Sequence, residues 1–314
     1  MADISAGMVK DLRDKTGVGM MDCKAALAAT NGGMEAAVDW LRAKGLAKAA
    51  KKSTRVAAEG LVAVAVEGTT GALVEINSET DFVARNEKFQ AMVAGISKLA
   101  LKAGGDSEIL KTMKYPGGTH AVAEYVAEMV AAIGENMTVR RTSALAVSSG
   151  VIGSYVHNQI APGMGKIGVI VALESTGKKD ELANFSRMLA MHVAATNPVA
   201  LTLDQVPADV LAREAAILEE KNAGKPANVM EKIVASGLKT FAKENCLLEQ
   251  AYVHDGAKTV AQAVADAGKA AGAEVKLTGF VRMQLGEGIE KKEDDFAAEV
   301  AKMSGTGEPP PEAK

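Results

Sequence analysis

Cysteine is scarce in this chain. Only Cys23 and Cys246 occur in 314 residues, far apart and without a CxxC pair. This usage fits a reducing compartment better than a disulfide framework. We expect both thiols to be buried as small hydrophobic side chains.

Histidine is almost as rare, with His120, His157, His192 and His254 scattered along the chain and no HExxH motif. A zinc site needs several such ligands at characteristic spacing, so the sequence predicts neither a metal site nor a cofactor. Each histidine is expected to be a hydrogen-bonded core residue or a surface residue.

Long apolar runs are also missing, since no stretch approaches the ~18–20 apolar residues that a membrane helix requires. The first residues, MADISAGMVKDLRDKTG, carry acidic side chains early and have the pattern of neither a signal peptide nor a transit peptide. The formal net charge is −3 and basic residues are dispersed, so no strongly basic surface indicates nucleic acid. We expect a cytoplasmic protein with no membrane partner and no direct nucleic-acid partner.

Motifs of enzyme catalysis are absent or out of context. GMGKIG at 163–168 fits GxGxxG, but it opens a strand rather than a helix, so a hairpin turn is the better interpretation. Gly224-Lys225 is followed by proline, which lacks the hydroxyl and the backbone donor of a phosphate loop. The sequence predicts a protein that binds no nucleotide itself and is not an enzyme, although an acid–base pair assembled by the fold stays open.

What the chain does contain is 48% hydrophobic residues, enough to bury more than one core. Apolar residues at helical spacing predict three short helices over 4–12, 20–27 and 34–41, which form a compact module. The basic Ala/Lys segment from Lys44 to Arg55 could be helical, but a solvated connector is the preferred interpretation, so we place the first boundary near residue 54.

Beyond that boundary, a strand, strand, helix order is predicted twice. It occurs over 61–66, 71–77 and 89–101, and again over 151–157, 167–173 and 182–195. An internal duplication and a chance similarity between two ordinary hairpins both stay open.

The last third of the chain is predicted to be mainly helical. Residues 204–245 are charged and alanine-rich with a break at Gly224–Pro226, which predicts a protruding helical hairpin. Further elements follow: a helix over 259–267, a strand over 275–285, a turn at Gly286 and Gly288, a last helix over 294–303, and a disordered tail over 305–314.

Taken together, these elements predict an α+β chain. We divide it into residues 1–54, 55–149, 150–285 with a helical insertion at about 200–245, and a carboxy-terminal module with its tail over 286–314.

Two segments carry a resemblance to a known family. LRDKTGVGMMDCKAAL at 12–27 and EINSETDFVARN at 75–86 closely resemble the two signatures of the bacterial translation elongation factor Ts family. Shorter similarities are IGEN at 133–136, HVAA at 192–195 and GEGIEK at 286–291, so the resemblance covers nearly the whole chain. It implies an amino-terminal domain similar to ubiquitin-associated domains, two related core subdomains, a helical insertion and a carboxy-terminal module.

The function that the resemblance implies is guanine-nucleotide exchange on elongation factor Tu, without covalent chemistry. In the family, the pair that matches Asp81 and Phe82 intrudes on the GTPase near its magnesium site. Ser78 and Asp81 stand at capping-box spacing, so Phe82 is expected in the first turn of a short helix at the end of the sheet. The competing interpretation is that Phe82 packs inside its own core, as most phenylalanines do.

The resemblance also implies a wider partner surface. The positions that match family contacts or the Thr-Asp-Phe-Val tetrapeptide are Leu12, Lys24, Thr80, Asp81, Phe82, Val83, Ile133, Gly134, His157, Val253 and Met303. Each has an ordinary structural alternative: a helix core, a solvated face, a helix end or strand packing.

Two questions stay open in the sequence. The chain could instead be a non-catalytic adaptor or scaffold, in which the first 54 residues bind peptides as ubiquitin-associated domains do. The sequence also does not decide whether two copies form a homodimer.

Overall fold

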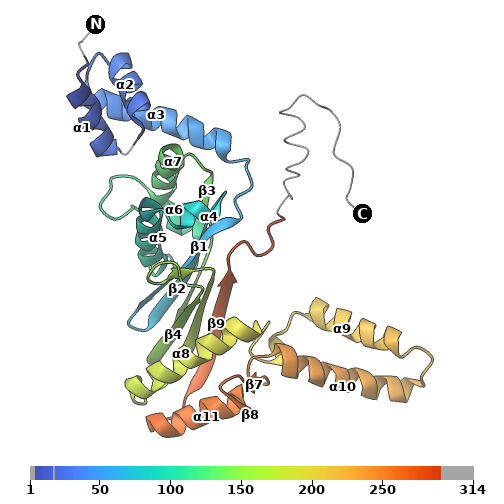
Figure 1. Cartoon of the computed structure of the whole chain (residues 1–314). Coiled ribbons are helices and arrows are strands. Elements are labelled where there is room, and N and C mark those ends of the chain that lie inside the picture. Colours follow the sequence, from blue (N-terminus) through green and yellow to red (C-terminus); the bar gives the residue numbers. More distant parts are fainter. Residues whose placement is uncertain (1–3, 17, 291–314) are drawn as a thin grey trace, which may run out of the picture.

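The computed structural model describes residues 4–16 and 18–290, and it has mixed α+β architecture (Figure 1). A helical module leads into two antiparallel sheets with helices packed on them, and a long helical hairpin projects from the body. The predicted α+β class is confirmed. Among the described residues, no helix has the length and hydrophobicity needed to cross a membrane.

The first module contains the three predicted helices, α1 (Ala6–Thr16), α2 (Met20–Ala29) and α3 (Met34–Lys52). Its core is a separate hydrophobic cluster formed by Val9, Leu12, Cys23, Ala26, Leu27, Ala37 and Leu41. Cys23 is fully buried there, and Cys246 is fully buried elsewhere, as predicted for both thiols.

The preferred interpretation of a solvated connector is wrong and the helical alternative is correct, because α3 continues without a break through Lys52. Alanine and lysine are strong helix formers, and tertiary packing extends the helix further than apolar spacing alone suggests. The last turns of α3 pack on α7 (Val122–Ile133), where Ala49 contacts the core of the first sheet. Arg42 Nη2 also lies 3.0 Å from Glu124 Oε1. Removal of residues 1–54 would therefore uncover part of this core.

The first sheet has the strand order β3-β2-β1-β5. Its strands are β1 (Glu59–Glu67), β2 (Thr70–Ser78), β3 (Met137–Ala146) and β5 (Met164–Gly165). The predicted hairpin of β1 and β2 and the predicted helix α5 (Glu87–Ala100) are confirmed. Sequence reasoning assigned no elements to α6 (Ser107–Thr112) or β3, and for α7 it weighed only a helix end at Ile133-Gly134.

The second sheet has the order β4-β6-β9. It contains β4 (Gly150–His157), β6 (Ile167–Glu174) and β9 (Lys276–Gln284), with α8 (Lys179–Thr196) and α11 (Val260–Ala271) packed against it. The glycine pattern at 163–168 joins β5 to β6, which confirms that it opens a strand. The strand, strand, helix order occurs in both halves, but their origin by duplication and the boundaries at 54, 149 and 285 stay predictions.

The helical hairpin consists of α9 (Ala208–Lys221) and α10 (Ala227–Asn245), and it projects from the body as predicted (Figure 1). The short 3-10 helix η1 (Leu203–Gln205) precedes it, and the small hairpin of β7 (Ala251–Tyr252) and β8 (Asp255–Thr259) follows it. The predicted helix 294–303 and tail 305–314 lie outside the described residues.

The two sheets stack face to face, because the side chains of β2 alternate between the helices on one face and the second sheet on the other. Ala72, Val74 and Ile76 pack toward the helices of the first half, whereas Leu73 packs toward the second sheet in a cluster with Ile170. Side chains of successive strand residues point to opposite faces, so Glu75 shares the inward face with Leu73. Its carboxylate is fully buried.

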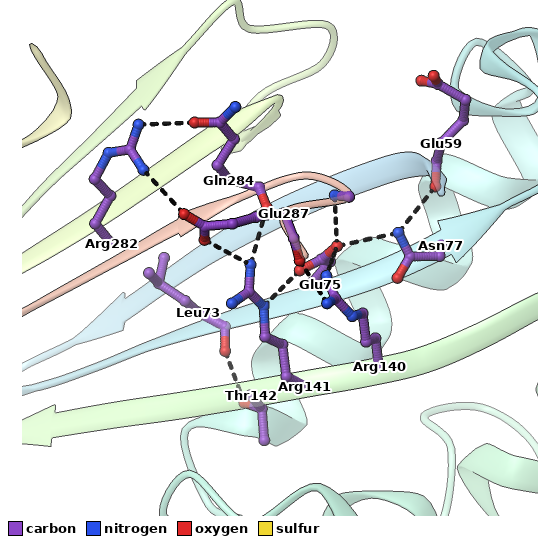
Figure 2. Close-up of polar contacts among 11 residues, drawn as sticks. Glu59, Leu73, Glu75, Asn77, Arg140, Arg141, Thr142, Arg282, Gln284 and Glu287 are labelled. Atoms are coloured by element: carbon purple, nitrogen blue, oxygen red, sulfur yellow. Dashed lines mark hydrogen bonds and ion pairs between the residues drawn. The ribbon is translucent and has the colours of Figure 1, made fainter. Parts of the chain in front are cut away.

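The Glu75 carboxylate is bound by groups from two other segments (Figure 2). Arg140 Nη1 and Arg141 Nε of β3 lie 3.0 and 2.6 Å from its two oxygens. The backbone N–H of Gly286, just beyond β9, donates to Oε1 at 2.8 Å. Gly286 has φ 71°, and a Cβ there would stand 2.5 Å from Ala58 O, so only glycine allows this approach.

The arginines also hold the end of β9 directly. Arg140 Nη2 donates to Glu287 O at 2.6 Å, and Arg141 Nη2 donates to Gln284 O at 2.9 Å. Burial would raise the pKa of the Glu75 carboxyl, but the donors Gly286 N–H and Arg141 hold this pKa below its ordinary value. The ionised carboxylate therefore links β2, β3 and the end of β9.

We expect Glu75→Gln to lower the free energy of unfolding by about 3 kcal/mol at neutral pH, because it leaves two arginines without their buried counter-charge. The pKa of Glu75 is lower in the folded state than in the unfolded state. Its contribution is therefore present above the unfolded pKa and is lost as the pH falls through the folded pKa. Urea unfolding at about pH 7 and about pH 4 should show the gap between wild type and variant shrinking with acid.

The matched control for this measurement is Glu108→Gln, whose exposed side chain pairs with Lys111 on the surface of α6. It should change stability by less than about 0.5 kcal/mol. A gap between wild type and Glu75→Gln that stays constant with pH would contradict the role of the ionised carboxylate.

Candidate functional site

Phe82 is the most conspicuous side chain near the end of the first sheet. It lies on α4 (Asp81–Ala84), which directly follows β2, and 77% of its surface is exposed. Its neighbours Val83 and Ala84 are only 3% and 2% exposed and belong to the core of the first sheet. Phe82 is therefore not a core residue. The helix is anchored by one face while Asp81 and Phe82 project from the other.

The helix begins differently from the predicted capping box. Thr80 is the residue before its first turn, and no side chain caps it. Ser78 Oγ instead donates to Thr80 O at 3.0 Å, which fixes the turn out of β2. At the other end, Arg85 N donates to Phe82 O at 3.1 Å, and Asn86 caps the following helix α5. The short helix is thus held by the segments on both sides.

A reciprocal pair of glutamates ties this segment to the residues after α7. Glu135 accepts from both the Thr80 N–H at 2.9 Å and the Thr80 hydroxyl at 2.7 Å. Glu79 in turn accepts from Asn136 N–H at 2.5 Å. Each carboxylate receives backbone donors of the opposite segment, and such charge-assisted hydrogen bonds are stronger than neutral ones. We call these residues, Glu79, Thr80, Glu135 and Asn136, the glutamate clamp.

The chain reaches the clamp through a left-handed residue and is joined there by the end of α3. Gly134 ends α7 with φ 94°, a conformation that favours glycine. Lys52 Nζ donates to Gly134 O, and Asn136 Nδ2 donates to Arg55 O at 2.7 Å. The clamp therefore connects the last turn of the helical module to the helix that carries Phe82.

The clamp was missed by sequence reasoning, which assigned no role to Glu79, Glu135 or Asn136. These residues do lie inside two of the segments that carry the family resemblance. Their pairing, however, spans more than fifty positions and requires α7 and β3 to be in place. The one signal in the sequence that could have indicated the clamp is that each segment has a glutamate, Glu79 or Glu135, next to a turn of the backbone.

The other predicted contact residues fall into three groups. Lys24 on α2, His157 at the end of β4 and Val253 between β7 and β8 are exposed, and Ile133 and Gly134 are partly buried beside the clamp. Leu12 and Val83 are buried in hydrophobic cores, so their side chains offer no surface to a partner in this conformation. Met303 lies outside the described residues.

His157 has a neighbour that orients it. Tyr155 Oη lies 3.2 Å from His157 Nδ1, and both residues are on β4. In the described ranges, no group of three or more His, Cys, Asp or Glu side chains is arranged to hold a metal ion.

Comparison with known proteins shows which family this chain resembles. The family model described as elongation factor TS matches residues 79–287. A protein of Methylocella silvestris named elongation factor Ts is 62% identical over 304 residues, which cover 96% of this chain and 98% of that protein. Proteins of the same name from Methylorubrum populi and Xanthobacter autotrophicus are 60% and 58% identical over 305 residues, or 97% of this chain and 100% and 99% of theirs.

We expect Glu135→Ala to loosen α4 without unfolding the chain, because it removes both acceptors of Thr80. Hydrogen exchange at the Thr80 amide should accelerate roughly tenfold or more, since a local opening replaces a charge-assisted bond. The measurement is amide exchange followed by nuclear magnetic resonance. Glu108→Ala, which removes an exposed carboxylate on α6, should leave the Thr80 amide unchanged. Equal exchange in both variants would show that the clamp does not hold the helix.

Proposed function

The chain belongs to the elongation factor Ts family, and from this premise we propose that α4 carries the wedge with which it acts on elongation factor Tu. The function is guanine-nucleotide exchange: the protein binds the GDP-bound GTPase and releases GDP so that GTP can bind. We propose that this takes place in the cytoplasm, where protein synthesis occurs, and that it involves no covalent chemistry.

The observation that supports this proposal is a large aromatic ring, 77% exposed, on a helix whose other face is buried. Aromatic side chains are characteristic anchors of protein interfaces. The buried residues Val83 and Ala84 and the glutamate clamp keep the helix in place before binding. Less conformational entropy is then lost when the ring enters a pocket.

Exchange requires tighter binding to the empty GTPase than to the GDP-bound form. Linkage then makes the factor weaken GDP binding by the same ratio. We propose that Phe82 enters a pocket of elongation factor Tu near its magnesium site. Asp81 would bring a carboxylate beside the ring, and this negative charge would disturb the coordination of magnesium and phosphate.

One ring cannot supply the whole difference, because burying a phenylalanine contributes only about 2–3 kcal/mol. We therefore propose a wider interface in which Lys24, His157 and Val253 are direct contacts, with Ile133 and Gly134 beside the wedge. Leu12 and Val83 would act indirectly, by holding α1 and α4 in place. Met303 stays in the proposal on the resemblance alone.

We expect Phe82→Ala to slow the release of labelled GDP from elongation factor Tu by roughly ten- to hundredfold in kcat/KM, the equivalent of losing one buried ring. The fold should stay intact, because an exposed side chain contributes little to stability. Ile109→Ala on α6 is the matched control, since it also truncates an exposed apolar residue. Wild-type exchange by a well-folded Phe82→Ala would contradict the wedge.

A second prediction separates exchange from the adaptor alternative. Binding free energy is a state function, so the coupling between this protein and GDP is reciprocal. The factor by which this protein weakens GDP binding to elongation factor Tu equals the factor by which GDP weakens binding of this protein to elongation factor Tu. The dissociation constant of the two proteins should rise with added GDP, and more steeply with magnesium present. The titration is run at fixed ionic strength so that charge screening does not mimic the effect. A flat dependence would leave only the adaptor.

A further inference from the structure

The Val253 turn is held from inside the protein by a buried histidine. Val253 lies between β7 and β8, and its side chain is 49% exposed. Its backbone N–H points the other way and donates to His192 Nδ1 at 3.2 Å. His192 lies on α8 and is fully buried, so the contact joins an exposed turn to the interior.

The hydrogen bonds around Gln250 determine which nitrogen of His192 carries the proton. Gln250 Nε2 donates to the carbonyl oxygen of Glu244 at 2.7 Å, and because a carbonyl can only accept, the amide group has one orientation. Gln250 Oε1 then faces His192 Nε2 at 2.9 Å, so Nε2 bears the hydrogen. Nδ1 is left as the acceptor for Val253. Burial also lowers the pKa of His192, which favours this neutral form.

The same hydrogen bonds reach the helical hairpin. Glu244 is in the last turn of α10, and its carbonyl is one of the groups that a helix end leaves without an intrahelical partner. The chain of contacts therefore runs from α10 through Gln250 and His192 to the amide of Val253. Gln250 is 4% exposed and Tyr252 is 6% exposed, so water is largely excluded along it.

We propose that His192 and Gln250 are positioning residues that hold the Val253 turn in the conformation that elongation factor Tu binds, and that they set this turn relative to the base of the α9–α10 hairpin. The inference rests on the proposed function, in which Val253 is a partner contact. Neither residue touches the partner. Each acts through the backbone of the turn.

Two substitutions at His192 separate positioning from general stability. His192→Asn places an amide oxygen near the position of Nδ1 and can still accept from Val253, whereas His192→Gln reaches the position of Nε2 and cannot. Both remove the ring. In the free protein, hydrogen exchange at the Val253 amide should rise at least about tenfold in His192→Gln and stay within about threefold of wild type in His192→Asn. Thermal melting measures the folded fraction of each variant.

The same variants are then titrated with nucleotide-free elongation factor Tu. His192→Gln should weaken the complex roughly three- to tenfold, and His192→Asn should bind nearly as wild type does. Because His192 acts through the turn, the double variant with His192→Gln and Val253→Ala should bind elongation factor Tu little more weakly than Val253→Ala alone. In the double variant with Phe82→Ala, the two losses of affinity should multiply. Three results would each overturn the proposal. The two His192 variants could lose the same affinity, the losses of His192→Gln and Val253→Ala could multiply in the double variant, or Val253→Ala alone could bind as tightly as wild type.

A measurement on the wild-type protein covers the case in which a variant does not fold. Nitrogen chemical shifts of His192 should show the tautomer with hydrogen on Nε2, and hydrogen on Nδ1 would overturn the proposal. Failure of the proposed function is distinguishable, because the wild-type chain would then not accelerate GDP release while the His192 tautomer and the Val253 amide protection remained as described.

Discussion

The architecture depends on one buried carboxylate. Glu75 occupies an inward position of β2, where an apolar residue would otherwise fit the space between the two sheets. An unpaired charge there would destabilise the chain by roughly 3–5 kcal/mol, so its partners must be in place whenever the chain is folded. Those partners are two arginines of β3 and the backbone of Gly286. The requirement brings the end of β9 back onto the first sheet and gives the two halves a defined relation.

The same strand that buries Glu75 delivers Phe82 seven residues later. Anchoring on one side and projection on the other are both needed, because a ring on a mobile loop would lose entropy on binding. Val83, Ala84 and the glutamate clamp supply the anchoring, and the clamp also receives the end of α3. Movement of the helical module would therefore be transmitted to α4. Such a connection would suit the wider interface proposed above.

The second half repeats this principle with different chemistry. At α4, carboxylates accept from backbone donors at a partly exposed site. At the Val253 turn, a neutral histidine in the interior accepts from a backbone donor, and the Gln250 amide beside it donates to a backbone carbonyl. A charged group at the position of His192 would be destabilising, because the partners that bond to His192 among the described residues, Gln250 and the Val253 N–H, carry no counter-charge. In both places an exposed apolar side chain is carried by a backbone whose hydrogen bonds are made inside the protein.

The sequence alone determined what short-range patterns encode. Helical spacing predicted α1, α2 and α5, alternating or apolar runs predicted the hairpin of β1 and β2, and the Gly224–Pro226 break predicted the projecting arm. The Thr-Asp-Phe-Val segment predicted a partner contact at Phe82 through its resemblance to a family signature, because the residues of that signature are contiguous. Tertiary structure decided the rest. The continuation of α3 to Lys52, the burial of Leu12 and Val83, and the pairing of Glu79 with Asn136 depend on elements far apart in the chain. Exposure and hydrogen-bond partners are properties of the packed molecule, because a local pattern records only which side chains share a face.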